Sequence, residues 1–125
     1  MKPRNADTTF TLAVPKLKEA IAWYTRFLGV PPEVESVTVL GRNARYFEFQ
    51  NETQIFLVEG DSEAVDMFPF WLGVPDLNKE LDRLLVAGLK PLRVYEPKLG
   101  SGRHTDFLDP YGYRIGFFEL KTRLP

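Results

Sequence analysis

The sequence matches itself when it is displaced by 60 residues, so that FTLAVPKL at 10–17 falls on FWLGVPDL at 70–77. Over residues 10–59 the displacement gives ten identical pairs, where average amino-acid usage would give about three. The pairs are Phe10/Phe70, Leu12/Leu72, Val14/Val74, Pro15/Pro75, Leu17/Leu77, Pro31/Pro91, Val34/Val94, Phe47/Phe107, Ile55/Ile115 and Glu59/Glu119. A fixed internal period of this kind indicates that one supersecondary unit occurs twice in the chain.

The first copy predicts a strand, a helix and three further strands. Alternating apolar residues predict a strand over 8–14, and apolar residues at helical spacing predict a helix over 16–28 that ends at Gly29. Three more strands are expected near 34–40, 44–50 and 54–59, with turns at 41–43 and 51–52.

The second copy predicts the same order. It contains a strand at 68–74, a helix at 76–87 with Asp76 as N-cap and Gly88 at its end, and strands near 89–95, 103–108 and 113–119. Residues 60–67 are interpreted as a linker. The predicted fold class is therefore α+β, with two βαβββ modules in tandem (about 8–59 and 68–120) forming a curved mixed sheet around a cavity, with the helices outside. We expect residues 1–125 to form one domain.

Composition excludes several classes of function. The chain has 16 Lys and Arg against 17 Asp and Glu, which gives a net charge of −1 and no positive field for nucleic-acid phosphates. It has no cysteine, and therefore no disulfide or thiolate metal site. The opening MKPRNADTTF lacks the apolar run of a signal peptide, and no segment has the length of a membrane span. We expect a cytoplasmic protein with neither a nucleic-acid nor a membrane partner.

Strand alternation sorts the side chains into two sets. One set is expected to face the helices and consists of Phe10, Leu12, Val14, Phe70, Leu72 and Val74. The other set is expected to face the cavity and consists of Thr9, Thr11, Ala13, Tyr46, Glu48, Phe56, Val58, Pro69, Trp71, Gly73, His104, Asp106, Gly116 and Phe118.

Three segments resemble a known family. VPKLKEAIAWYTRFLGV (14–30) and VPDLNKELDRLLVAGL (74–89) resemble the openings of the two halves of glyoxalase/bleomycin-resistance (vicinal-oxygen-chelate) domains. GRHTDFLDPYGYRIGFFE (102–119) resembles their closing segment. The resemblance covers about residues 8–120. Within it, Asp109-Pro110-Tyr111-Gly112 is expected to be the structural turn that leads into the last strand.

The resemblance also implies where a metal would bind. Metal-dependent members carry a His or Gln on the first strand of a half and a Glu on its last strand. The positions that match are Thr9 and Pro69 for the first ligand and Phe56 and Gly116 for the second. None of the four provides a strong donor for a divalent cation. We therefore expect no metal and no cofactor at the inherited positions.

The remaining candidates are aromatic and polar residues of the cavity set. The predicted ligand-binding residues are Trp71, Phe118, Phe56, Thr9, Thr11, Tyr46 and His104. Trp71 is expected either to stack on a ligand or to fill a closed core. His104, the single histidine, is either solvated or, with Asp106 and Glu48, a weak candidate for proton transfer.

Three functions remain open. The first is a homodimeric, metal-free protein of the bleomycin-resistance type, which sequesters an aromatic or apolar small molecule in an internal or dimer-interface cavity. The second is a metal-dependent lyase, isomerase or dioxygenase of the same superfamily, with a rearranged site near His104. The third is a structural or regulatory module whose core is filled.

Overall fold

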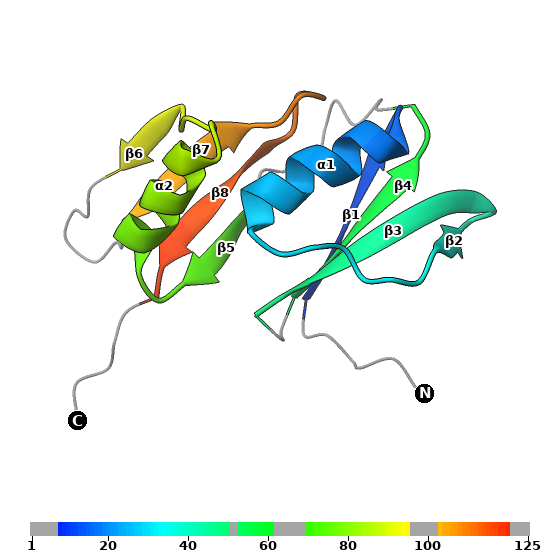
Figure 1. Ribbon diagram of the computed structural model, residues 1–125, viewed down its shortest axis with the longest axis horizontal. Coiled ribbons are helices and arrows are strands. Elements are labelled where there is room, and N and C mark those ends of the chain that lie inside the picture. Colours follow the sequence, from blue (N-terminus) through cyan, green and yellow to red (C-terminus); the bar gives the residue numbers. More distant parts are fainter. Residues whose placement is uncertain (1–7, 51–52, 62–69, 96–102, 121–125) are drawn as a thin grey trace. The chain divides into compact units, whose positions relative to one another are not determined.

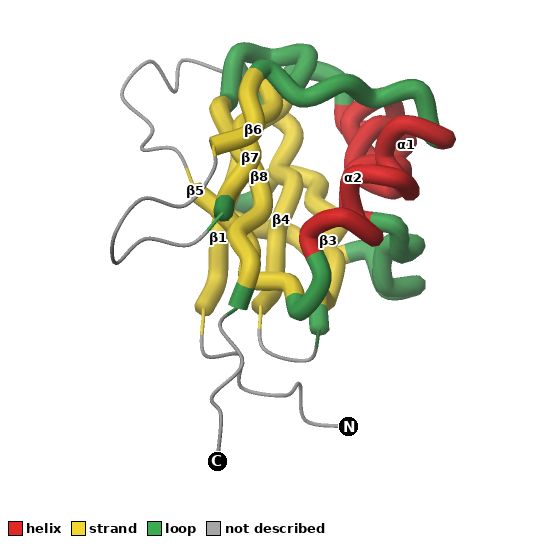
Figure 2. Tube along the Cα trace, turned by 90° about the vertical axis from the view of Figure 1, so that its left-hand side faces the viewer, coloured by secondary structure: helices red, strands yellow, loops and turns green. Residues whose placement is uncertain are grey.

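In each half of the chain, one helix covers one face of a four-stranded sheet (Figures 1 and 2). The computed structural model describes residues 8–50, 53–61, 70–95 and 103–120. The chain divides into two compact units, residues 1–65 and 66–125. Neither helix in the described ranges has the length and apolar composition needed to cross a bilayer.

The first unit contains one helix and four strands. These elements are β1 (Thr8–Val14), α1 (Leu17–Leu28), β2 (Val37–Val39), β3 (Arg42–Phe49) and β4 (Thr53–Glu59). The strand order in the sheet is β1-β4-β3-β2, with β1 parallel to β4 and the other neighbours antiparallel.

The second unit repeats this arrangement. Its elements are β5 (Phe70–Val74), α2 (Leu77–Val86), β6 (Arg93–Tyr95), β7 (His104–Leu108) and β8 (Arg114–Glu119). The sheet order is β5-β8-β7-β6, again with one parallel pair, β5 and β8. The predicted α+β class with tandem βαβββ modules is confirmed.

The repeat extends to the register of the strands. Phe10 pairs with Ile55 in the first unit, and Phe70 pairs with Ile115 in the second. The amide of Gly60 donates to the carbonyl of Val14 over 2.8 Å, and the amide of Leu120 donates to that of Val74 over the same distance. Residues 60 apart therefore occupy the same place in their units.

The side chains of each sheet separate as alternation predicts. Five apolar residues of the first sheet and five of the second are almost completely buried on the side of their helix: Leu12, Val14, Phe47, Ile55, Leu57, Leu72, Val74, Phe107, Ile115 and Phe117. We term the opposite side of each sheet the far face. Strand register assigns to it Thr9, Thr11, Tyr46, Glu48, Gln54 and Phe56 in the first unit, and Trp71, Gly73, His104, Asp106, Gly116 and Phe118 in the second.

Two strands are shorter than predicted. β2 covers 37–39 rather than 34–40, and β6 covers 93–95 rather than 89–95. In the second case the amide of Leu89 donates to the carbonyl of Leu84 and so completes the end of α2, while Pro91 has no amide hydrogen to offer to a neighbouring strand. The predicted strand residues 68–69, the turn at 51–52 and most of the linker (62–67) lie outside the described residues.

The first hairpin turn is one residue earlier than expected. Leu40 and Gly41 have φ angles of 52° and 77°, so they form the two-residue turn with left-handed backbone that suits the twist of a hairpin. Val39 and Arg42 pair across it, and β3 consequently begins at Arg42 rather than after residue 43.

The helix caps and the last turn follow the predictions. Gly29 ends α1 with φ 74°, and the carboxylate of Asp76 accepts from the amide of Lys79 over 3.1 Å at the start of α2. In the turn before β8, the Oδ1 atom of Asp109 accepts from the amides of Tyr111 (2.9 Å) and Tyr113 (2.8 Å). Gly112 provides the left-handed residue of that turn, with φ 93°.

Candidate functional site

The far face of the first sheet carries two rows of residues, which include the predicted ligand-binding residues Thr9, Thr11, Tyr46 and Phe56. Thr9, Gln54 and Glu48 are aligned across neighbouring strands in one row. Thr11, Phe56 and Tyr46 form the next row, in which Thr11 is exposed. The rings of Tyr46 and Phe56 are stacked, with centroids 5.0 Å apart and planes 18° apart. The face thus combines an aromatic platform with a polar row beside it.

Gln54 also lies on this face, although it is not one of the predicted site residues. It lies between Thr9 and Glu48 in the register and is partly buried. Strand alternation would have found it, because it stands two residues before Phe56 on the same strand. Its amide offers both a donor and an acceptor to a ligand on the platform.

On the far face of the second sheet, Trp71 is held by a hydrogen bond. Its Nε1 atom donates to Oδ1 of Asp106 over 2.8 Å. Asp106 is only 4% exposed, and a buried carboxylate of this kind requires such a donor. The ring of His104 meets the indole edge-on, with centroids 5.8 Å apart. Trp71 is half-buried, and Phe118 is 39% exposed.

Gly116 makes the position of the indole possible. It stands between Trp71 and Asp106 in the strand register. A Cβ atom added at Gly116 would overlap the carbonyl oxygen of Thr105 and lie 2.7 Å from Cδ1 of Trp71. The absence of a side chain therefore lets the indole cover the backbone and reach Asp106.

The candidate residues form two groups, one in each unit. Tyr46 and Phe56 are in direct contact in the first, and Trp71, His104 and Asp106 are in direct contact in the second. The candidates for proton transfer are divided between the units, with Glu48 on β3 and the other two on β7. The carboxylate of Asp106 is also engaged by the indole rather than being directed only at His104.

The positions implied by the family do not fit a divalent cation. Thr9 offers one hydroxyl, Phe56 an aromatic ring and Gly116 no side chain, and Pro69 lies outside the described residues. Divalent ions need several oxygen or nitrogen donors at one point. Across the described ranges, no three His, Asp or Glu side chains are grouped so that they could hold a metal ion.

The phenol of Tyr46 reports on the charge around the first far face. Burial, and then the negative charges of Glu33, Glu35 and Glu48, raise its pKa above the ordinary value of 10.0. The folded protein thus keeps this proton at a pH where the unfolded chain has lost it. The resulting contribution to stability is fully present below pH 10.0 and is lost as the pH rises through the folded-state pKa.

A pH titration tests this arrangement. Subtracting the absorbance titration of Tyr46→Phe from that of the wild type isolates the phenolate of Tyr46. Its absorbance should develop at a higher pH than that of free tyrosine. Glu48→Gln should shift that transition to lower pH, because one of the repelling charges is removed. Asp82→Asn, on the exposed side of α2, is the matched control. A Tyr46 transition that Glu48→Gln leaves unmoved would contradict the placement of Glu48 beside the phenol.

Comparison with known proteins gives both a family and structural neighbours. The family model of the Glyoxalase/Bleomycin resistance protein/Dioxygenase superfamily matches residues 8–117. No curated protein matches the chain significantly.

Solved structures of similar fold include proteins that are named for different roles. A glyoxalase/bleomycin resistance protein from Catenulispora acidiphila DSM 44928 has a TM-score of 0.75 and 23% identity, over 94% of this chain and 100% of that one. TnmS3, an antibiotic binding protein from Streptomyces sp. CB03234, has a TM-score of 0.70 and 20% identity, over 97% of this chain and 99% of that one. A lactoylglutathione lyase from Agrobacterium tumefaciens has a TM-score of 0.69 and 17% identity, over 94% of this chain and 96% of that one. At these identities the similarity is one of fold.

The family match covers most of the chain, and the duplicated module and the turn at Asp109 agree with it. This protein is therefore a member of the glyoxalase/bleomycin resistance protein/dioxygenase superfamily.

Proposed function

We propose that this protein binds a flat aromatic or apolar small molecule against Trp71 on the far face, without a metal ion. The observation that carries the proposal is the arrangement of Trp71, Asp106 and Gly116. Where metal-dependent members of the family carry a glutamate, this chain has a glycine covered by an indole. An aromatic surface at this position suits a flat ligand rather than a cation.

The indole is suited to stacking because it is already held in place. Its hydrogen bond to Asp106 fixes the ring in the absence of ligand, so that little side-chain entropy remains to be lost on binding. An aromatic pair contributes about 0.5–1.5 kcal/mol beyond the burial of its surface. The exposed part of Phe118 offers further aromatic surface on the same far face, and His104 remains the proposed polar contact there. In the first unit, the stacked pair of Tyr46 and Phe56, with Thr9 and Thr11 on the same face, remains a proposed ligand-binding surface in its own right.

The structural neighbours include both classes of function. TnmS3 is an antibiotic binding protein, whereas the Agrobacterium protein is a lyase. The donor set at Thr9, Phe56 and Gly116 favours the first class for this chain. We expect the protein to act in the cytoplasm as a homodimer. The mass of the particle in solution would test the number of subunits.

The two tryptophans permit a matched fluorescence test. Trp23 lies on α1 and stacks on Phe27 with centroids 5.3 Å apart, away from the far face. Trp23→Phe leaves Trp71 as the only indole, and Trp71→Phe leaves Trp23. The probes are anthraquinone-2-sulfonate, 9-anthracenemethanol and 9-aminoacridine, which share a flat ring system but differ in charge.

At least one probe should quench the fluorescence of Trp71 in the Trp23→Phe variant. The quenching should be saturable, and metal chelators should not alter it. Trp71→Phe should bind that probe at least about tenfold more weakly, which corresponds to about 1.4 kcal/mol. Equal binding by both variants, or no saturable binding of any probe, would contradict the proposal.

The metal-dependent alternative rests on His104, which shares the far face of β7 with Asp106. It predicts stoichiometric nickel, zinc, iron or manganese in the purified protein, and loss of that metal in His104→Ala. This result would replace the proposal of a metal-free receptor with that of a lyase, isomerase or dioxygenase.

A further inference from the structure

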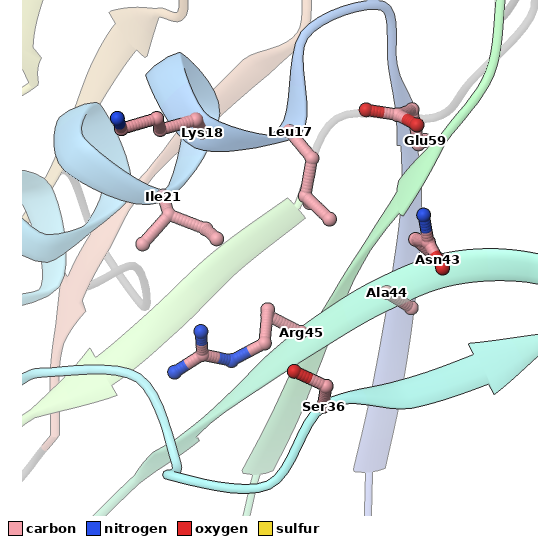
Figure 3. Close-up of a pocket in the computed structure, with 8 residues that line it drawn as sticks. All are labelled: Leu17, Lys18, Ile21, Ser36, Asn43, Ala44, Arg45 and Glu59. Atoms are coloured by element: carbon pink, nitrogen blue, oxygen red, sulfur yellow. The ribbon is translucent and has the colours of Figure 1, made fainter.

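A hollow lies on the other side of the first sheet, between α1 and the face that the helix covers (Figure 3). Its volume is about 500 Å³, which is within the range of small-molecule sites. Its lining includes Leu17, Ile21, Ser36, Asn43, Arg45 and Glu59. It belongs to the helix side, because Asn43, Arg45 and Glu59 alternate with the far-face residues of β3 and β4.

The hollow has an apolar roof and two polar ends. Figure 3 shows Leu17 and Ile21 extending from α1 toward β3, with Arg45 and Ser36 at one end and Asn43 and Glu59 at the other. An amphipathic molecule fits such a lining, because its apolar body can lie under the helix while its polar groups reach the two ends.

Arg45 is held in place at its end. Its Nε and Nη2 atoms donate to the carbonyl of Glu33 over 3.2 and 2.9 Å. The remaining nitrogen, Nη1, takes no part in this contact and carries two further N–H donors. A guanidinium fixed through one edge is well suited to receiving a carboxylate, because its orientation is set in advance.

In the second repeat, the corner formed by the equivalent positions Asp76, Thr105 and Glu119 is closed by hydrogen bonds within the protein. There the Oε2 atom of Glu119 accepts from the amide of Leu77 over 3.0 Å, and Asp76 caps the helix as well. Thr105, which replaces Arg45 in the repeat, is fully buried, and its hydroxyl accepts from the amide of Phe117 over 3.3 Å. The polar groups of this corner are thus used internally.

In the first repeat each of these closing features has changed. Lys16 stands where the second repeat has Asp76, and its side chain makes no cap hydrogen bond. Glu59 is exposed, and within the described ranges its carboxylate makes no bond to the amide of Leu17 equivalent to that of Glu119. Arg45 and Glu59, the counterparts of Thr105 and Glu119, line the hollow in the first repeat.

From this divergence we propose that the hollow is a second binding site, for a small organic carboxylate that has an apolar body and a hydrogen-bond donor at its far end. The carboxylate binds Arg45 and the hydroxyl of Ser36. The body lies under Leu17 and Ile21, and the donor meets Glu59. The neighbouring Lys18 brings the lining to two positive charges against one negative, which favours a monoanion.

The test follows backbone amide signals by NMR during addition of 4-hydroxyphenylacetate. This probe has a carboxylate, a ring and a hydroxyl donor at the opposite end. The amides of Ser36, Asn43 and Arg45 should shift in a saturable way at concentrations up to about 10 mM. The matched probes 4-hydroxyphenethyl alcohol and 4-hydroxyphenethylamine have the same ring and hydroxyl. The alcohol should bind at least about tenfold more weakly, and the amine should not shift these signals.

Three variants in the lining and one control variant separate a binding site from a merely local effect. Arg45→Gln should weaken binding by at least about tenfold, and Ile21→Phe should reduce it by occupying the space under the helix. Because Arg45 also holds the carbonyl of Glu33, Ser36→Ala provides a variant at an exposed position that leaves the fold intact, with binding weakened severalfold. Arg114→Gln, an exposed arginine on β8, should bind as wild type does.

The outcomes distinguish this site from the far-face proposal. Absence of saturable shifts at Ser36, Asn43 and Arg45, or equal binding of the carboxylate and the alcohol, would overturn the second site. Shifts confined to Tyr46 and Phe56 would also overturn it, since they would assign the carboxylate to the far face. Quenching of Trp71 by the flat probes is measured separately and does not depend on the result.

Discussion

Gly116→Ala is expected to lower the free energy of unfolding by about 2–3 kcal/mol. The new Cβ atom would overlap the carbonyl oxygen of Thr105, which belongs to the backbone of β7 and cannot move aside without disturbing the sheet. It would also press on Cδ1 of Trp71, 2.7 Å away. Urea denaturation, followed by circular dichroism, measures the loss.

Gly73→Ala is the matched control for this prediction. Gly73 is on the same far face, but an added Cβ would meet side chains rather than backbone: Cζ of Phe118 and Cδ2 of Leu120, each at 2.9 Å, and Cγ of Leu120 at 3.3 Å. These groups can rotate away, so the loss should be below about 1 kcal/mol. Similar losses in the two variants would show that the indole and the β7 backbone do not fill the space above Gly116.

The same packing bears on metal binding. A Gly116→Glu variant would restore the residue type that metal-dependent members of the family carry, but its Cβ atom would meet the same carbonyl oxygen. The packing of β5, β7 and β8 therefore opposes a glutamate at this position, and we expect the single substitution Gly116→Glu to create no metal site.

Asp109→Ala should be the most damaging substitution in a turn, with a loss of about 3 kcal/mol in the free energy of unfolding. Asp109 is 4% exposed, and its Oδ1 atom accepts from the amides of Tyr111 and Tyr113. Alanine removes a charged acceptor from two backbone donors, of which the bond at Tyr113 is buried. Thermal unfolding, compared at a fixed temperature, measures the loss.

Two variants calibrate this result. Asp109→Asn keeps one acceptor oxygen and should lose roughly half as much. Asp76→Ala also removes a carboxylate that accepts from a backbone amide, but at an exposed helix N-terminus, and should lose only about 1 kcal/mol. If Asp109→Ala were no more damaging than Asp76→Ala, the turn would not depend on its buried hydrogen bonds.

The sequence predicted most of the fold because the repeat and the alternation of apolar residues are local signals. Both helices, the eight strands in order and the helix face of each sheet followed from them. The errors fell where local geometry competes with alternation. Leu40 adopts a positive φ that leucine rarely takes, and Pro91 keeps the chain after α2 out of the sheet.

The candidate site could be predicted only as a set of residues that share a face. Alternation placed Trp71, His104 and Asp106 together, but the hydrogen bond from Nε1 of Trp71 depends on a side-chain rotamer, which sequence does not specify. The hollow under α1 was missed for a different reason. Its signal lies in the polar differences between the copies, such as Arg45 against Thr105, whereas the repeat was recognised from identities.

Residue 33 joins the two faces of the first sheet. Its amide donates to the carbonyl of Tyr46 over 2.8 Å, and its carbonyl receives the guanidinium of Arg45. Arg45 and Tyr46 are neighbours on β3 whose side chains point to opposite sides. A ligand that moved the guanidinium would thus pull on the backbone that carries the aromatic platform. If one ligand occupies the hollow and another the aromatic platform, the factor by which the first changes the affinity of the second equals the factor by which the second changes the affinity of the first.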